Sequence, residues 1–137
     1  MTSTCVKKGD TIIKKYIVDE DIRHIRGIQH HWERECFALD ILKGKPHTPE
    51  LLKIEPNKIT MSYCGKHITK KTLPKNWKKQ CKEINQMQMG LQLYHTDIKL
   101  ENICVKDGTI FLIDWGMIAR HQRDWHPIEN TIQTLWD

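Results

Sequence analysis

The sequence predicts an α+β fold in which strand hairpins and helices follow one another along one chain. Short β-prone runs flank turns rich in Gly, Asp or Pro, and two long segments repeat apolar residues every three or four positions. Strands and helices are segregated along the sequence, as in α+β domains. At 137 residues the chain is long enough for one domain with a real core and too short for two ordinary ones. We therefore expect a single domain over residues 1–137.

Composition and charge narrow the setting in which the chain acts. With 22 Lys+Arg, 17 Asp+Glu and a net charge of +5, the chain weakly favours polyanionic partners. Five cysteines without CxxC spacing indicate neither a zinc site nor a disulfide framework, so a reducing setting fits best. No apolar run approaches the roughly 20 residues of a membrane span, and the start lacks a signal-peptide core. We expect a cytoplasmic protein with no membrane partner.

The first part of the chain predicts a hairpin followed by a long helix. Residues 3–6 and 11–16 are β-prone runs around a Lys-Lys-Gly-Asp turn. From about Asp19, apolar residues recur at helical spacing until Gly44, a natural stop, and Gly27 is a candidate break. Glu35 lies close to the apolar stripe, where a carboxylate needs a cation.

The middle of the chain predicts a second hairpin and a second helix. Residues 51–55 and 58–63 are β-prone runs around Pro56-Asn57. Pro74 is in the favoured first-turn position of the next helix. The inward stripe of that helix is expected to contain Trp77, Cys81, Ile84, Met87 and Leu91. Pro127 begins a short last helix.

The stretch from Tyr94 to Gly116 carries most of the chemistry. A polar loop over residues 95–102 precedes two apolar runs, and the Asp107-Gly108 pair between them is a strong hairpin signal. If the hairpin closes there, Asn102 and Asp114 emerge at the same end and offer two oxygen ligands. Taken alone, the loop is explained equally well as a polar turn between a helix and a strand.

The string HTDIKLEN at residues 95–102 resembles the protein-kinase catalytic loop, and IDWG at residues 113–116 resembles the metal-binding Asp-Phe-Gly turn. The order of elements also matches over residues 3–118. The resemblance implies a protein-kinase-like fold with two parts. Residues 1–65 would form a reduced N-lobe with an antiparallel sheet and a long αC-type helix. Residues 66–137 would form a minimal helical C-lobe that carries the catalytic hairpin.

The resemblance implies a role for each polar residue of this stretch. Asp97 would orient the accepting hydroxyl and take its proton, and Lys99 would place an ammonium on the transferring phosphate. Asn102 and Asp114 would supply oxygen atoms to one or two Mg²⁺ ions.

The same resemblance implies a nucleotide site upstream. Lys14 would hold the α- and β-phosphates of ATP, and Glu35 would pair with Lys14 and fix its direction. The nucleotide would also contact a hinge made of Ser62, Tyr63 and Cys64. Two alternatives stay open. Lys15 competes with Lys14, which shares a strand face with an isoleucine, and Glu33 competes with Glu35, which is followed four residues later by a leucine.

Several departures from the kinase pattern set limits on these expectations. No glycine-rich loop precedes Lys14, since only Gly9 lies upstream, and the first strand of the usual sheet is expected to be absent. Thr96 replaces the usual Arg, and no Ala-Pro-Glu motif follows Gly116, so peptide docking on a large helical lobe is not expected. Trp115 replaces the usual Phe. What remains is similar to small atypical kinases, lipopolysaccharide-core kinases and aminoglycoside-type phosphotransferases. A chain of this size suits a compact viral genome, which would place it in the host cytoplasm.

Two functions from different classes follow from the sequence. The first is an ATP- and Mg²⁺-dependent phosphotransferase acting on Ser or Thr of a protein, or on itself. The alternative is a pseudokinase-like module that binds a nucleotide or a protein or RNA partner without catalysis. Lysines cluster from Lys66 to Lys79, where a solvated face is the default and an acidic or RNA partner is the alternative. The sequence gives no oligomeric state.

Overall fold

An antiparallel sheet built from two hairpins forms one side of the protein. The structure, a computed structural model, describes residues 3–17 and 22–137, without the side chains of residues 22–30. The strands are β1 (Ser3–Lys8), β2 (Thr11–Tyr16), β3 (Leu51–Glu55) and β4 (Lys58–Ser62). Their order in the sheet is β1-β2-β4-β3, so the two hairpins meet through β2 and β4. Both predicted hairpins are confirmed.

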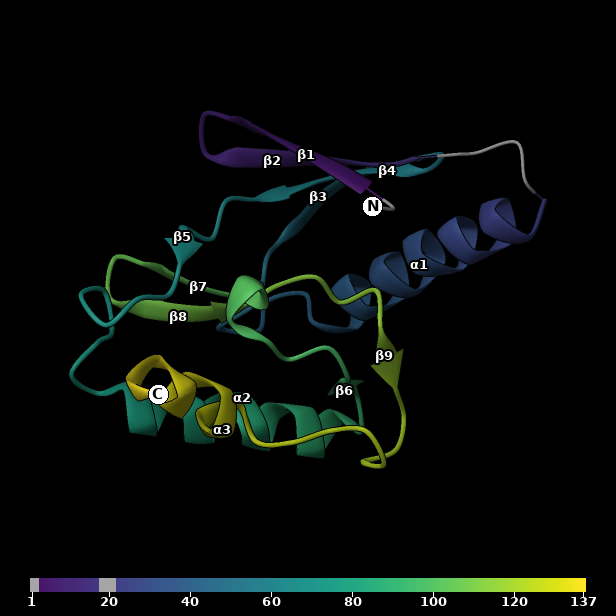
Figure 1. The fold of residues 1–137 in the computed structure, drawn as a ribbon. Helices are drawn as coiled ribbons and strands as arrows, with labels where there is room; N and C mark the ends of the chain where they lie inside the picture. Colours follow the sequence, from purple (N-terminus) through teal and green to yellow (C-terminus); the bar gives the residue numbers. More distant parts are fainter. Residues whose placement is uncertain (1–2, 18–21) are drawn as a thin grey trace.

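Helix α1 (Ile22–Ile41) connects the two hairpins and lies beneath the sheet (Figure 1). It runs through Gly27 without a break, so the predicted break there is wrong. It also ends before Gly44, because the amide of Lys45 turns back to the carbonyl of Leu42 at 2.9 Å. The predicted start near Asp19 lies outside the described residues.

The second part of the chain contains another hairpin and the remaining helices. Strand β7 (Ile103–Lys106) pairs with β8 (Thr109–Leu112) around Asp107 and Gly108, both with positive φ, which confirms the hairpin predicted there. On its other edge β7 pairs with the short strand β5 (Lys66–His67). Helices α2 (Trp77–Leu91) and α3 (Ile128–Ile132) lie side by side below this sheet (Figure 1). Strands β6 (Tyr94–His95) and β9 (Ile118–Ala119) form a two-stranded ladder.

Helix α2 differs from its prediction in its start and in its buried face. It begins at Trp77, and Pro74 instead opens the turn that leads into the helix, its carbonyl accepting the Trp77 amide at 3.1 Å. Trp77, Met87 and Leu91 are only partly buried, whereas Gln80 and Gln88 are buried. The reason is that Gln80 satisfies the β7–β8 hairpin, accepting the Ile110 amide at 2.7 Å and donating to the Gly108 carbonyl at 2.9 Å.

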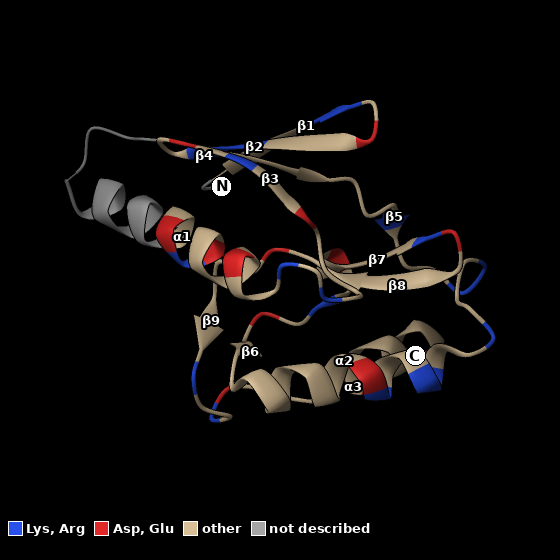
Figure 2. Ribbon diagram, turned by 180° about the vertical axis from the view of Figure 1, so that it is seen from behind, with Lys and Arg blue, Asp and Glu red and all other residues tan. Residues whose placement is uncertain are grey.

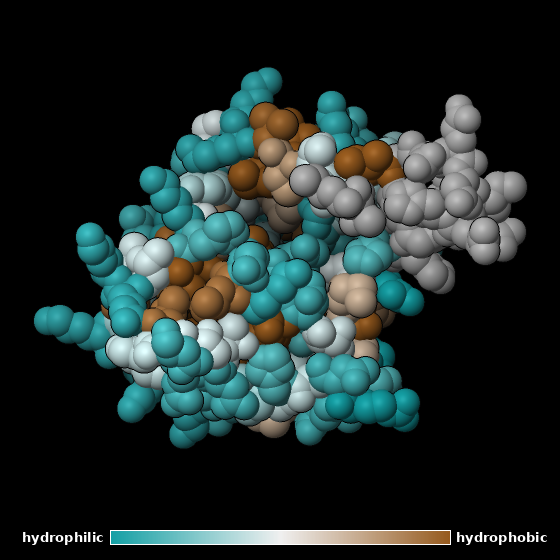
Figure 3. Space-filling model, viewed as in Figure 1, coloured by the Kyte–Doolittle hydropathy of each residue, from teal (hydrophilic) through white to brown (hydrophobic). Residues whose placement is uncertain are grey.

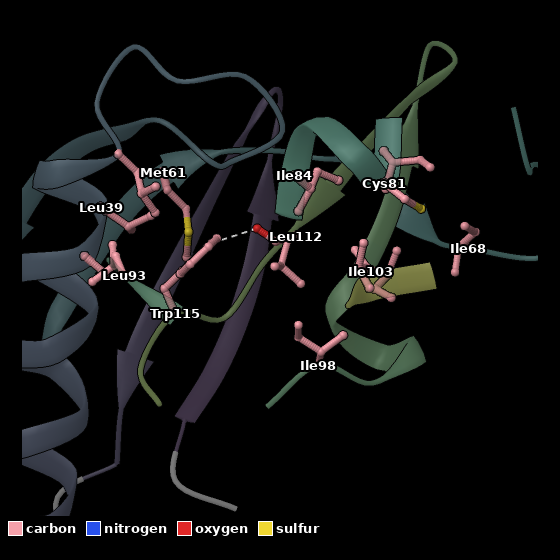
Figure 4. Close-up of a cluster of buried hydrophobic side chains, with 14 of the residues drawn as sticks. Leu39, Met61, Ile68, Cys81, Ile84, Leu93, Ile98, Ile103, Leu112 and Trp115 are labelled. Carbon is pink, nitrogen blue, oxygen red and sulfur yellow. Dashed lines mark hydrogen bonds between the residues drawn. The ribbon is translucent and has the colours of Figure 1, made fainter. Parts of the chain in front are cut away.

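A core of buried side chains joins the upper sheet and α1 to the lower hairpin and α2 (Figure 4). Leu39 and Met61 meet Trp115 from above, and Leu112 lies beside it. Trp115 is completely buried, and its indole N–H donates to the Leu112 carbonyl at 2.8 Å. This partner explains how a tryptophan fits a position where the kinase pattern has phenylalanine. Within the described residues, no helix is long and apolar enough to cross a membrane.

Candidate active site

A cavity of about 320 Å³ opens between the upper sheet and the β7–β8 hairpin. Figure 3 shows the hollow on this face, with hydrophobic side chains at its mouth. The sheet contributes apolar side chains together with Lys14 and Ser62, and the opposite wall contributes Asn102 and Asp114. The polar and charged lining includes Lys14, Ser62, Asn102 and Asp114. With Tyr63 and Cys64, six of the residues predicted to contact nucleotide or metal therefore line one space.

Lys14 reaches this cavity because the side chains of β2 alternate between the two faces of the sheet. Its ammonium lies 2.7 Å from Glu35 Oε1 and 3.2 Å from Asp114 Oδ1, and the residue is only 5% exposed. The neighbouring Lys15 points to the other face and is exposed. The structure thus favours Lys14 over Lys15 as the buried ammonium.

Glu35 is fully buried behind Lys14 and joins three segments of the chain. Its Oε1 accepts hydrogen bonds from Lys14 and from the hydroxyl of Tyr16, and its Oε2 accepts the Trp115 amide at 2.9 Å. It is not part of the cavity lining, and its hydrogen bonds connect Lys14 to the turn after Asp114. Glu33 is exposed on the same helix. Tyr16 was not predicted, although its place two residues after Lys14 on one strand is the signal that could have found it.

The charges of Lys14 and Asp114 stay in place at neutral pH. Burial works to lower the pKa of Lys14, but Glu35 and Asp114 outweigh it and raise the pKa. Burial likewise works to raise the pKa of Asp114, but the Lys14 ammonium outweighs it and lowers the pKa. Burial and the charge of Glu35 raise the pKa of Tyr16, which therefore remains a neutral donor. One ammonium and two carboxylates leave a net negative charge beside the cavity.

Asn102 connects the polar loop to the strand end that carries Asp114. Its side-chain amide donates to the Asp97 carbonyl at 2.8 Å and reaches Asp97 Oδ2 at 3.3 Å. Its own carbonyl accepts the Ile113 amide at 2.9 Å, so Asn102 and Asp114 leave the hairpin at the same end. A short 3₁₀ turn, Leu100–Asn102, brings Asn102 into this position.

His95 fixes the loop from below. It is buried, its Nδ1 accepts the Asp97 amide at 3.1 Å, and this leaves Nε2 to donate to the Ile113 carbonyl at 2.7 Å. Burial lowers the pKa of His95, which keeps the ring neutral in this tautomer. The His95 amide in turn donates to Gln88 Oε1 at 2.9 Å. Gln88 was not predicted, although a polar residue on the inward face one turn after Ile84 is the signal for it.

Asp97 and Lys99 are held differently from the other site residues. Their side chains are 37% and 54% exposed, and Lys99 Nζ lies 3.6 Å from Asp97 Oδ2. Among the described residues, the cavity lining includes neither of them. The structure places both in the loop beside the cavity, next to Asn102, with their side chains open to solvent.

The predicted hinge forms the remaining wall of the cavity. Ser62, Tyr63 and Cys64 all line it, and burial raises the pKa of the Cys64 thiol to about 12, so the thiol is neutral. Gly65 follows with a φ of 93°, and a Cβ there would lie 2.1 Å from the Val105 carbonyl oxygen. Only glycine permits this close approach of the hinge to β7.

Comparison with solved structures finds a similar fold in two kinases. The bifunctional kinase-methyltransferase WbdD superposes with a TM-score of 0.69 at 14% identity, over 98% of this chain and 33% of that one. The Rio2 kinase of Chaetomium thermophilum, in an ADP/Mg²⁺-phosphoaspartate complex, gives a TM-score of 0.61 at 13% identity, over 97% of this chain and 50% of that one. The fold is kinase-like. The chain spans half or less of the length of these two neighbours. No protein-family model and no curated protein matches the sequence.

In this kinase-like fold, the oxygen atoms of Asn102 and Asp114 suit a magnesium ion. Mg²⁺ usually binds one or two protein ligands and fills its remaining positions with phosphate oxygens and water. The net negative charge around Lys14 favours a cation at this point, and the Asp114 side chain is partly open to the cavity. Within the described chain, no group of three or more His, Cys, Asp or Glu residues could hold a metal ion.

Proposed function

We propose that the protein is an ATP- and Mg²⁺-dependent phosphotransferase whose acceptor is a hydroxyl group on a protein or on the chain itself. One observation carries the proposal. The Lys14 ammonium bridges Glu35 and Asp114 at the wall of a cavity that Asn102 also lines. Phosphoryl transfer needs fixed charges around the phosphates more than it needs covalent chemistry, and this cluster supplies them.

The proposed nucleotide lies in the cavity with its base against the hinge and its phosphates toward Lys14. Bound through Asn102 and Asp114, Mg²⁺ would neutralise phosphate charge. Lys14 binds the phosphates, and Glu35 keeps the ammonium pointed at them. Because the cluster exists before ligand binds, little rearrangement is needed to form the site.

Asp97 is the proposed base that orients the acceptor hydroxyl and takes its proton. Two hydrogen bonds fix its backbone. The Asp97 amide donates to the His95 ring, and the Asp97 carbonyl accepts from the Asn102 side chain. Its carboxylate is partly exposed, which leaves it accessible to an acceptor that approaches from solvent. Lys99, beside it, is the proposed contact of the transferring phosphate.

A non-catalytic nucleotide-binding module is the second candidate. It is favoured because few residues cover the phosphate end of the cavity. Within the described residues β1 is the edge strand, and it contributes only Ser3 and Cys5 to the lining. No glycine-rich loop is present in that part of the chain, because the β1–β2 turn contains a single glycine, Gly9.

The test separates binding from transfer. Thermal unfolding is measured with ATP, with and without Mg²⁺, and a Mg²⁺-dependent rise of the midpoint is expected, since a ligand of the native state stabilises it. Transfer is then followed with γ-labelled ATP on the protein and on a generic acceptor protein. Asp114→Asn is expected to abolish transfer, and Asp10→Asn, an exposed carboxylate, is its control.

Two outcomes would reject the enzyme. If the midpoint rises but no label is transferred, the protein is a nucleotide-binding module. If label appears and Asp97→Ala leaves it unchanged, the transfer comes from a contaminating kinase or from another site.

A further inference from the structure

The positive charge of this protein is concentrated in one segment. Residues 56–82 contain 8 of the 22 Lys+Arg and none of the 17 Asp+Glu. Seven of these lysines are exposed, and within the described part of the chain no carboxylate pairs with them. They are Lys66, Lys70, Lys71, Lys75, Lys78, Lys79 and Lys82. We call this set the lysine segment. In Figure 2 its blue positions gather along the connector after β5 and on the first turns of α2.

The position of the lysines on α2 argues against a merely solvated face. Lys78 and Lys79 lie in the first turn of α2, and that turn contains no acidic residue. The helix macrodipole places partial positive charge at this end, so lysines there are repelled and reduce helix stability. A face serving solubility alone would place acidic residues at this end. An anionic partner would remove the repulsion.

A groove with aromatic walls adjoins these lysines. It measures about 570 Å³ and lies between α2 and the segment that contains α3. Lys78 and Lys82 line one side, and Trp77 and Trp125 supply aromatic walls. Glu129 is the single acidic residue of the lining, and its carboxylate already accepts a hydrogen bond from Asn85 at 2.7 Å.

The tryptophan rings are held in place by neighbouring side chains. Trp125 packs edge-on against Tyr94 with ring centroids 5.5 Å apart, and its indole N–H donates to Gln88 at 3.0 Å. Trp77 packs against Trp136 with centroids 5.9 Å apart, and the Lys78 ammonium lies 5.6 Å from the Trp77 ring. Rings that are already oriented bind a flat partner at low entropic cost.

We propose that the lysine segment and this groove bind single-stranded nucleic acid, with phosphates on the lysines and an unpaired base against the tryptophans. Lysines give sequence-independent contacts to a phosphate backbone. The half-buried rings of Trp77 and Trp125 beside them offer surfaces for base stacking, because every base carries a π-face. An acidic protein would use the lysines but has no matching use for the fixed rings. The proposal is independent of phosphate transfer.

Binding is measured by fluorescence anisotropy with a labelled 12-nucleotide oligouridylate and the full chain. The test variant replaces Lys75, Lys78 and Lys82 together by Gln. It is expected to weaken binding at least ~10-fold. The slope of log K against log salt should also fall by about 2, or about 0.7 for each phosphate contact. The matched control replaces Lys8, Lys15 and Lys43, three lysines exposed elsewhere, and is expected to change affinity less than twofold.

An abasic strand of the same length tests the tryptophan groove without altering the protein. Base stacking is worth roughly 1–3 kcal/mol per base, so the abasic strand is expected to bind at least ~5-fold more weakly. The proposal is overturned if the two strands bind equally or if both triple variants lose the same affinity. It is also overturned if no binding occurs at ~50 mM salt, or if poly-glutamate binds more tightly. Asp97→Ala should leave binding unchanged, so failure of phosphate transfer and failure of this proposal are distinguished.

Discussion

Lys14 and Asp97 lie on two sides of the same candidate site and differ in how their side chains are held. Lys14 is buried, and its ammonium contacts two carboxylates at 2.7 and 3.2 Å. The Asp97 carboxylate is 37% exposed, and its position is set mainly through its backbone amide and carbonyl. The groups proposed to meet the phosphates are therefore fixed by side-chain contacts. The group proposed to meet the acceptor has only longer side-chain contacts, at 3.3 Å to Asn102 and 3.6 Å to Lys99.

Substitutions of Lys14 are therefore expected to affect stability, whereas substitutions of Asp97 are expected to affect mainly the proposed activity. A buried charge must be paired, so removing one member of the Lys14 cluster leaves an uncompensated charge in the core. A partly exposed carboxylate can be replaced while water solvates what remains. The substitutions below test this contrast in order of their expected effect on stability.

Lys14→Met is expected to have the largest effect. It leaves Glu35 buried without its cation, which costs about 3–5 kcal/mol. Lys15→Met, on the exposed face of the same strand, is expected to stay within ~0.5 kcal/mol. Urea unfolding of both variants measures the difference. Equal losses in the two would mean that the buried cluster does not form.

Tyr16→Phe removes one donor from the buried Glu35 carboxylate. A hydrogen bond to a charged group contributes about 1.5–3 kcal/mol, and a loss of this size is expected in the same unfolding experiment. Tyr63→Phe is the control, because the Tyr63 hydroxyl makes no hydrogen bond to the described residues. An unchanged stability in Tyr16→Phe would contradict the contact between Tyr16 and Glu35.

The lowered pKa of His95 is expected to give a smaller, pH-dependent change in the free energy of unfolding. Its pKa is lowered in the folded protein from the ordinary 6.5, so below pH 6.5 the unfolded chain takes up a proton that the folded ring does not. Stability should therefore fall as the pH drops from 6.5 toward the folded pKa, by up to about 1.4 kcal/mol per pH unit. His95→Gln should lose this slope, whereas the exposed His121→Gln should keep it. A slope that persists in His95→Gln would assign it to another group.

Asp97→Asn should have the smallest effect on stability and a large one on transfer. The unfolding free energy is expected to change by less than ~0.5 kcal/mol. Loss of the proton acceptor should lower the transfer rate by about 10²–10⁴-fold. Asp124→Asn, an exposed carboxylate outside the site, should change neither quantity. A strongly destabilised Asp97→Asn would show that the contrast with Lys14 is wrong.

Local patterns were enough to predict the hairpins and to favour Lys14 over Lys15 as the inward lysine. Period-two alternation and turn residues depend on neighbours in sequence, so β1–β2, β3–β4 and β7–β8 could be read directly. The short strands β5, β6 and β9 could not be read, because two residues carry no period and their pairing depends on distant partners.

Contacts between distant segments account for what the sequence did not reveal in the site. The third hydrogen bond of Glu35 comes from Trp115, 80 residues away, and no local pattern carries it. The buried face of α2 includes Gln80 and Gln88 because hairpin and loop amides need acceptors there. The exposure of Asp97 likewise depends on how the loop meets its neighbours.

Gly65 gives the candidate site a property that its side chains do not control. Since the hinge meets β7 backbone against backbone, the width of the cavity at this wall is set by main-chain contact. Substitutions at Ser62, Tyr63 or Cys64 can change the polarity of the wall but cannot move it closer to β7. The wall thus keeps a constant distance from β7. Preference among flat ligands therefore depends on the polarity of the wall and not on a change in the width of the cavity.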